Sequence, residues 1–545
     1  ATGSTIDADG DIELGAESAT EIDALAVGIA GALSRGSGTT GALAGAGSGV
    51  TNTIDNVIEA FITNSTDDGS VSDIDAGGSL TVSALDRSTI CADAAGVAIS
   101  AALAKSNGSS YGVAVGVSVA DNDINNEIRA TIDNRSVPSS GTPSVSAGGD
   151  VSLSATSTAK VDALSIGGAV AVGTSSKGTG FAFSGAGAGS GNTIRNTIEA
   201  VIKNGSTVAT TGTGAVKLTA MDASTIIADA GGVGIAVGAS GQGTGAALSI
   251  GVSIADNLIE NNTKAYIDGS TVTAAGNVEL TAVSAAKIDA LTIAGAVGVG
   301  ASATKGGYAG AGAGAASYND VKNTVEAYIK NAESVTSTAG SVKLTAVDGL
   351  YLFDAPELQA ADYLNDGALP ATWRTAFAAP GREITLSDDV TVAVRAAGRE
   401  WLVTDNDKGE TYLVKKELDT YRVLKPTVIT ANGGGVAIGV GASGEGTGGA
   451  LSVGVSVADN YINNTIRTTI DNSALPIPGD TSVSAAGDIT LSATSMAEID
   501  ALTIGGAIAV GASGGGSGYA GAGTGAAAYN KIENTIESFI KGVGS

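Results

Sequence analysis

The feature that most constrains this chain is a short strand-like segment that recurs seven times. It begins at Asn52, Asn122, Asn192, Asn257, Asn319, Asn460 and Asn530. At its eighth position the charge changes sign with every recurrence, the residues being Glu59, Arg129, Glu199, Lys264, Glu326, Arg467 and Glu537. Unlike charges attract and like charges repel across strands about 4.8 Å apart, so this alternation predicts that successive copies lie side by side as parallel, in-register strands.

A column of asparagines at the fifth position of the same segment is equally regular. Its members are Asn56, Asn126, Asn196, Asn261, Asn323, Asn464 and Asn534. Even spacing inside a strand favours an amide ladder in which each side chain donates to and accepts from the next copy. The alternative is that these asparagines form turns.

Two related half-units of about 65 residues, type A and type B, alternate along the chain, and residues 276–331 and 214–269 represent them. Each reads as two extended passages joined by a glycine-rich turn. The large apolar residues change parity midway, which predicts a bulge or corner near Asp229 and Asp256. Alanine and glycine segments such as residues 307–316 predict two sheets that approach more closely than the usual roughly 10 Å.

These patterns predict an all-β fold, a right-handed parallel β-solenoid of about seven large flattened coils with one half-unit in each. We expect the solenoid to occupy residues 1–349 and 427–545, because one type B copy stops after Gly349 and resumes near Thr427. Residues 350–426 form an insert, which we expect to be a small β-rich domain with a short helix near its start.

The insert holds both tryptophans, Trp373 and Trp401. They fill a small core in one interpretation and bind a sugar or a protein partner in the other. Asp405 and Asp407 match the start of a calcium-binding loop, but the later ligands of an EF-hand are missing, so a hairpin turn is favoured there.

Composition narrows the classes of function. A net charge of −27 argues against nucleic acid as a partner and favours solubility in salt or counter-ions such as Ca²⁺. Histidine is absent, which removes the commonest general base. The single cysteine, Cys91, aligns with Ile227 of another copy, so we expect it in the core. No apolar run is long enough to predict a membrane span.

No catalytic motif stands out. There is no nucleophile elbow, phosphate loop or Cys/His metal cluster, and the charged residues repeat with the coil, whereas an active site should be an off-pattern cluster in one place. The sequence therefore predicts no enzyme. The recurring Asp121, Asp256 and Asp459 are interpreted as corner caps, with cation binding as the alternative.

Strands such as those of residues 325–348 and 466–502 resemble the β-solenoid stalks of very large bacterial surface proteins, in the broad filamentous-haemagglutinin-like class. The segment at residues 358–373 is similar to those that interrupt such arrays. The resemblance implies an extracellular or cell-surface location and a structural or adhesive role. One departure is clear, because each coil here is much longer than the turn usual in that class.

From the sequence we expect a structural protein that forms an extracellular fibre, sheath or surface stalk by self-association, with no nucleic-acid partner and no cofactor apart from Ca²⁺ as an open alternative. The competing hypothesis is an adhesin that recognises a glycan or another surface through the insert or the outer face of the solenoid.

Overall fold

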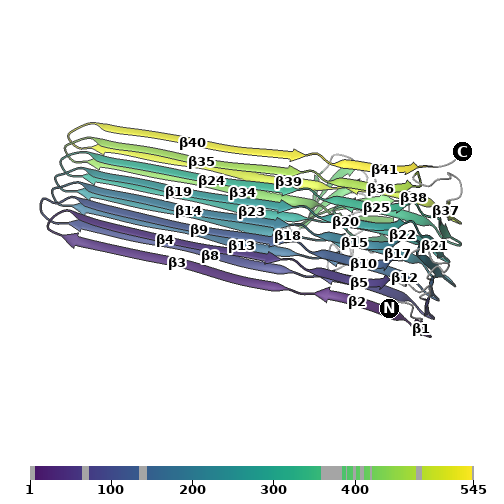
Figure 1. Ribbon diagram of the computed structural model, residues 1–545. Coiled ribbons are helices and arrows are strands. Elements are labelled where there is room, and N and C mark those ends of the chain that lie inside the picture. Colours follow the sequence, from purple (N-terminus) through teal and green to yellow (C-terminus); the bar gives the residue numbers. More distant parts are fainter. Residues whose placement is uncertain are drawn as a thin grey trace.

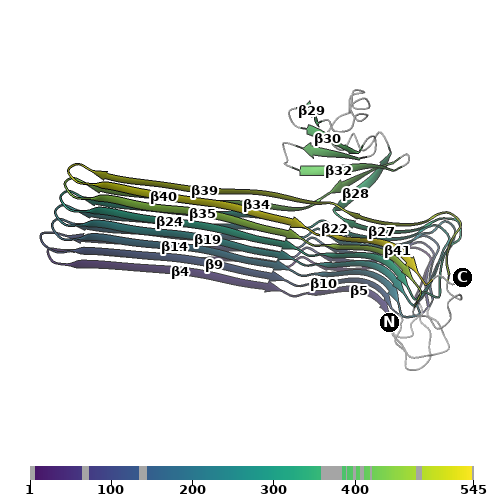
Figure 2. The same cartoon turned by 90° about the horizontal axis from the view of Figure 1, so that it is seen from above.

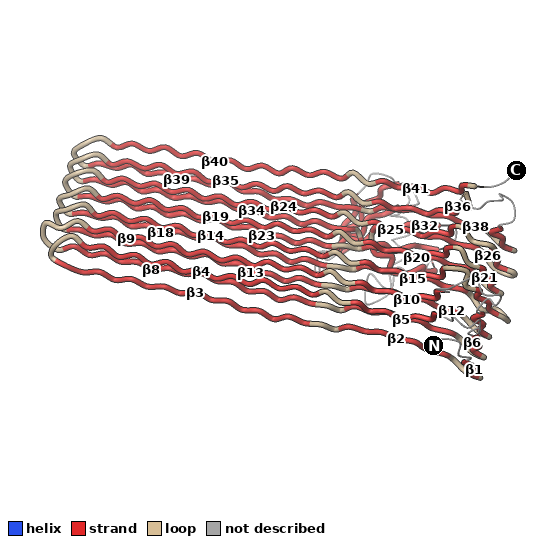
Figure 3. The backbone as a smooth tube through the Cα atoms, viewed as in Figure 1, coloured by secondary structure: helices blue, strands red, loops and turns tan. Residues whose placement is uncertain are grey.

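The computed structural model describes residues 6–63, 73–133, 144–356, 383–387, 390–396, 400–405, 410–417, 420–473 and 482–542. Within these ranges the regular structure is entirely β, as the tube in Figure 3 shows. The chain winds through seven parallel coils of five strands each, so that every strand pairs in register with its equivalents in the coils before and after (Figure 1). The expected parallel β-solenoid of seven coils is thus confirmed.

Five sheets of seven strands result. The first sheet contains β1 (Ile6–Ala8), β6 (Asp73–Ala76), β11 (Ser144–Ala147), β16 (Thr207–Thr210), β21 (Thr271–Ala274), β26 (Ser334–Ser337) and β37 (Ser482–Ala485). The second contains β2 (Ile12–Ser18), β7 (Leu80–Asp86), β12 (Val151–Ser157), β17 (Val216–Asp222), β22 (Val278–Ser284), β27 (Val342–Asp348) and β38 (Ile489–Ser495).

Two sheets of long strands follow. The outgoing sheet contains β3 (Glu21–Gly36), β8 (Thr89–Ala104), β13 (Lys160–Ser175), β18 (Thr225–Ser240), β23 (Lys287–Ser302), β34 (Thr427–Ser443) and β39 (Ala497–Ser513). The return sheet contains β4 (Thr40–Ile54), β9 (Ser110–Ile124), β14 (Gly180–Ile194), β19 (Gly245–Ile259), β24 (Gly307–Val321), β35 (Gly448–Ile462) and β40 (Gly518–Ile532). Together they form a flat blade (Figure 2).

The fifth sheet closes each coil beside the first two. It contains β5 (Val57–Thr63), β10 (Glu127–Asp133), β15 (Thr197–Lys203), β20 (Asn262–Asp268), β25 (Thr324–Lys330), β36 (Thr465–Asp471) and β41 (Thr535–Lys541). The first, second and fifth sheets together enclose a lobe at the base of the blade. The lobe core consists of stacked Leu, Ile, Val and Ala columns, represented by Leu218, Ile202 and Val278, which are fully buried.

The interior of the blade is built from the smallest side chains. Its buried columns are alanine, glycine and serine, and the two sheets lie in backbone contact. A Cβ added to Gly251 of β19 would lie 2.1 Å from the carbonyl oxygen of Gly295, and one added to Gly238 of β18 would lie 1.8 Å from that of Ala246. The sheets therefore approach as closely as the Ala/Gly segments predict, because no side chain separates them there.

The bulge or corner predicted near Asp229 and Asp256 is wrong. The same alternate positions stay buried from β17 through β18 and from β19 into β20. Only the size of the inward side chains changes, from Val, Leu and Ile in the lobe to Ala, Gly and Ser in the blade. Because the blade interior has no room for large side chains, Val233, Ile250 and their neighbours face outward.

The coil corners lie elsewhere. The chain bends between the second sheet and the blade at residues 223–224 of the fourth coil, and between the blade and the fifth sheet at residues 260–261. At the blade tip Ser240 holds the turn, because its Oγ accepts from the Gly243 N–H at 2.7 Å and donates to the Gly178 carbonyl of the preceding coil at 2.6 Å.

The insert branches from one such corner, between β27 and β34. Its described strands are β28 (Leu350–Pro356), β29 (Glu383–Ser387), β30 (Val390–Ala396), β31 (Glu400–Asp405), β32 (Glu410–Glu417) and β33 (Thr420–Lys425). They form one antiparallel sheet in which β28 pairs with β33, and β31 with β32 as a hairpin. The short helix expected early in the insert lies outside the described residues.

The backbone contact inside the blade generates a matched pair of tests. Gly251→Ala adds a methyl group against the facing backbone and is expected to destabilise the fold by about 1 to 3 kcal/mol, the range of overpacking. Gly312→Ala, at an outward position of the same sheet with nothing within 4 Å of its Cβ, is expected instead to raise stability by about 0.5 to 1 kcal/mol, because glycine within a strand is less favourable than alanine. Urea unfolding of the two variants in dilute solution measures the difference, and equal effects would contradict the close packing.

Candidate functional site

The charged column of the fifth sheet forms a ladder up the outside of the stack. Its members lie directly opposite one another, Glu59 beside Arg129, Arg129 beside Glu199, and so on to Glu537. Arg129 bridges two coils, with Nη1 3.0 Å from Glu59 Oε1 and Nε 3.2 Å from Glu199 Oε2. Each cation thus neutralises carboxylates that would otherwise repel one another along the stack.

Farther along the ladder, Arg467 also bridges two coils, and Lys264 pairs with Glu326. Lys264 Nζ lies 3.3 Å from Glu326 Oε2, and Arg467 lies 3.0 Å from Glu326 and 2.7 Å from Glu537. Beside the ladder, the rings of Tyr266 and Tyr328 stack at 4.6 Å, and burial raises the pKa of both phenols. The outer face of the fifth sheet is therefore bound from coil to coil by ion pairs and one aromatic stack.

The two asparagine columns make different hydrogen bonds, and the amide ladder is not in the column for which the sequence predicts it. The uninterrupted amide ladder is made by the column that begins at Asn52, in which each Nδ2 donates to the Oδ1 of the next coil at 2.7 to 2.8 Å. Sequence reasoning noted this column only as the start of the segment. Its signal was present, because the same residue occupies the position in all seven copies.

The amide ladder predicted for the column that begins at Asn56 is wrong. Each side-chain Oδ1 accepts from the backbone N–H of the equivalent asparagine in the preceding coil at 2.7 to 2.8 Å. In most coils Nδ2 donates to a serine hydroxyl of the other corner, as Asn261 does to Ser224 at 3.0 Å. These asparagines sit where the strand breaks, so they bind the two corners of the coil together.

A buried carboxylate completes the corner in every second coil. Asp222 is fully buried, and one oxygen accepts from the Ser224 hydroxyl at 2.5 Å while the other accepts from Ser284 of the next coil at 2.9 Å. Asp86 and Asp348 occupy the same position in the second and sixth coils. Burial raises the pKa of Asp222, and it raises the pKa of Asp348 to about 6.

The insert leaves this corner intact. Asp348 is the last residue of β27, and Thr427, the first residue of β34, donates its hydroxyl to Asp348 Oδ1 at 2.5 Å. Ser224 makes the same contact to Asp222 in the uninterrupted coil. Thr427 therefore takes the place of the corner serine, and the solenoid resumes in register beyond the insert.

The outer faces of the blade carry large apolar side chains. On the return sheet Ile250 and Val252 of β19 are 39% and 38% exposed, and on the outgoing sheet Val233 is 45% exposed. Soluble monomers rarely expose contiguous apolar patches beyond a few hundred Å², so faces of this kind mark sites of interaction. Sequence reasoning missed them because it assigned these residues to the interior.

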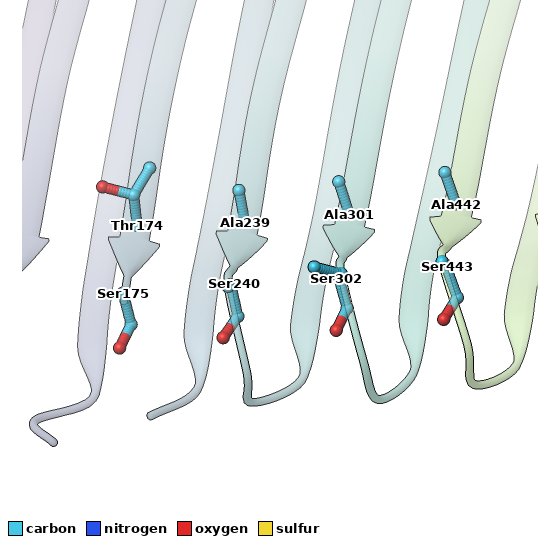
Figure 4. Close-up of a pocket in the computed structure, with 11 residues that line it drawn as sticks. Thr174, Ser175, Ala239, Ser240, Ala301, Ser302, Ala442 and Ser443 are labelled. Atoms are coloured by element: carbon cyan, nitrogen blue, oxygen red, sulfur yellow. The ribbon is translucent and has the colours of Figure 1, made fainter. Parts of the chain in front are cut away.

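Two depressions on the surface of the described chain involve residues of the blade tips and of the charge ladder. One, of about 340 Å³, runs along the blade tips past Thr174, Ser240 and Ala301, and the hydroxyls of Ser240 and Ser443 in it point toward the tip turns (Figure 4). Its serines are committed to the tip turns. The other, of about 300 Å³, lies over the ladder between Glu59 and Lys203, with Phe61 in its wall. The charged side chains that line this depression form the ion pairs of the ladder.

The remaining residues that the sequence singled out do not lie together at one site. Cys91 is not in the core: it lies half-exposed on the outer face of β8 between Asp23 and Asp162, and burial and Asp162 raise its pKa. Asp121, Asp256 and Asp459 lie on the outer face within strands of the return sheet and cap no corner.

The insert residues are only partly placed. The backbone of Trp401 and Asp405 lies in β31, whereas Asp407 and Trp373 fall outside the described residues. Among the part of the chain that the structure describes, no three His, Cys, Asp or Glu side chains gather as a metal site. In the same part of the chain, no helix is long and apolar enough to cross a membrane.

Comparison with other proteins does not assign the chain to a family. No protein-family model matches it, and neither curated proteins nor solved structures give a significant match. Any function has to be argued from the ladders, the corners and the outer faces themselves.

The charge ladder predicts an asymmetric response at Lys264. Lys264→Glu places three carboxylates on adjacent strands and is expected to lower stability by about 2 kcal/mol, whereas Lys264→Gln removes only the attraction and costs about 0.5 to 1 kcal/mol. Added salt screens repulsion, so 0.5 M NaCl should reduce the deficit of the Glu variant more than that of the Gln variant. Urea unfolding at two salt concentrations tests this, and indistinguishable variants would argue against the ladder.

The buried carboxyl group of Asp348 predicts a pH dependence. A carboxyl whose pKa is raised in the folded state binds its proton more tightly there, so its contribution to stability is full below about pH 4 and is lost as the pH rises through about 6. For Asp348 the loss is about 3 kcal/mol. Asp348→Asn cannot ionise and should gain stability relative to the natural chain between pH 4.5 and pH 7.5. Thermal unfolding across this range measures the gain, and parallel pH profiles would refute the assignment.

Proposed function

We propose that this chain is a structural protein that builds an extracellular fibre, sheath or surface stalk by stacking and self-association of its β-solenoid coils. The observation that carries the proposal is the direction of its specific polar contacts. The charge ladder and the amide ladder both run from coil to coil along one axis. A body bonded this way resists extension along its axis, as a stalk or fibre must.

Three further observations support a mechanical role. Many of the described charged residues repeat with the coil, and several of them form ion pairs between coils, as Lys217 does with Asp150 and Lys264 with Glu326. Neither depression gathers unpaired catalytic groups, and the proposal assigns no catalysis. The blade faces are apolar and exposed, which suits contact between neighbouring chains. Placement outside the cell rests on the resemblance of the repeat to surface stalks.

An adhesin is the second candidate. The observation that favours it is the construction of the insert, an antiparallel sheet that leaves and re-enters the solenoid at one corner, so that its strands β28 and β33 pair at the junction. A module attached in this way is able to vary without disturbing the stack. As an adhesin, the protein would recognise a glycan or another surface through the insert or the outer face beside Phe61.

Deleting residues 350–426 separates the two candidates. The deletion joins Gly349 to Thr427, which reproduces the two-residue corner of the fourth coil and keeps the hydroxyl bond to Asp348, so we expect a folded solenoid with an unchanged β-sheet circular dichroism spectrum.

If the role is structural, both the natural chain and the deletion variant should form regular assemblies in electron micrographs. A glycan-array signal that disappears with the deletion, from a chain that forms no assemblies, would reject the structural proposal in favour of the adhesin. Failure of the deletion variant alone to fold would contradict the equivalence of Thr427 and Ser224.

A further inference from the structure

The outer face of the return sheet is corrugated. In three neighbouring outward columns, large aliphatic residues on β9, β19 and β35 alternate with glycine or alanine on β4, β14, β24 and β40. One column consists of Gly47, Val117, Gly187, Val252, Gly314, Val455 and Gly525. Over these three columns the face therefore has ridges along every second strand, about 9.6 Å apart, with grooves between them.

The groove glycines are not required by the chain's own packing. An added Cβ at Gly47, Gly189, Gly312 or Gly314 would meet nothing within 4 Å. Glycine within a strand is destabilising by about 0.5 to 1 kcal/mol relative to alanine, so a row of it needs a reason. Inside the blade the reason is the facing backbone, but on this outer face the fold supplies none. A body outside the chain that fills the groove would supply one.

The outgoing sheet lacks this pattern. There the large residues of adjacent strands are staggered, as Ile293 lies beside Gly231 while Val233 lies beside Gly295, so no continuous groove runs along a strand. The insert also branches from the outgoing side of the coil, between β27 and β34. The return face is thus the one shaped for regular contact.

We propose that the corrugated return face binds the same face of a second copy of this chain, ridges into grooves. This inference rests on the proposed function and names the surface that serves it. A ridge spacing of two strands matches the groove spacing of the same face, so the chain is its own complement. A two-fold axis parallel to the strands, with the copies offset by one strand, seats β19 of one copy over β14 or β24 of the other.

The size and charge of the face suit this partner. Five neighbouring outward columns, from the position of Gly41 to that of Gly49, contain no charged residue in any coil. Three of these columns are corrugated, and the two nearer the tip carry larger side chains such as Tyr111 and Phe183. The five columns together cover about 1,000 Å² in the offset pair, above the roughly 800 Å² per partner of a standard stable interface. Two copies of net charge −27 would repel elsewhere, but here they meet without opposing like charges. The long strands are nearly straight (Figure 1), which allows contact along their length.

Sedimentation of the full chain tests the proposal. We expect the natural chain to associate at micromolar concentration, and Val252→Lys in a ridge and Gly314→Leu in a groove each to weaken association at least tenfold without altering thermal unfolding of the separated chains. Val233→Lys is the matched control, since it adds the same charge at a valine of the outgoing face that is 45% exposed, against 38% for Val252, and should leave association unchanged.

Three other results would contradict the inference. A natural chain that stays monomeric at 50 µM would overturn both this inference and the proposed function. Association that Val252→Lys and Gly314→Leu leave unaffected would overturn the inference alone, because the chains would then assemble through another surface. Binding to phosphatidylcholine vesicles by monomeric chains, lost in Val252→Lys but kept in Val233→Lys, would assign the face to a lipid surface instead.

Discussion

The structure depends on one constraint, that equivalent residues of successive coils lie directly beside each other. Parallel, in-register pairing of this kind brings every position next to its own repeat, so a column of identical charges would be repulsive along the whole stack. The chain avoids this by alternating Glu with Arg or Lys and by using asparagine, which both donates and accepts, in the column that begins at Asn52. Register, ladder chemistry and the two types of half-unit are consequences of the same constraint.

A second consequence of the stacked coils is that large and small side chains are buried in different parts of the molecule. The lobe encloses enough space for Leu, Ile and Val, whereas the blade has only two sheets whose backbones touch, as at Gly251 and Gly295. The large aliphatic side chains of the blade are therefore on its outer faces, where residues such as Val233 and Ile250 remain 45% and 39% exposed in the isolated chain. This arrangement suits a protein whose blade faces are covered by neighbouring copies, and it connects the packing to the proposed structural function.

The corners show how such a stack tolerates an insertion. The polar groups of the bend are buried. Asp222, Ser224 and Asn261 hydrogen-bond across the two corners of one coil, and Ser284 of the next coil donates to Asp222. At the interrupted coil Thr427 supplies the hydroxyl that Ser224 supplies elsewhere, so the interruption changes the covalent path without changing the contacts. An insertion at any position inside a strand would instead shift the register of every column that follows.

Much of the coil architecture could be predicted from the sequence. The repeat, the sign alternation at Glu59 and Arg129 and the resumption at Thr427 determined the coil count, the pairing and the place of the insert, because periodic charge is informative only when strands are in register. The direction of the blade side chains was not readable, since Ala, Gly and Val alternate there and both faces look apolar. Only contact with the facing sheet decides that Ala236 is inside while Val233, Ile250 and Cys91 are outside. The same holds for Asn56, which tertiary structure places at a corner beside a serine rather than in the ladder that its spacing suggested.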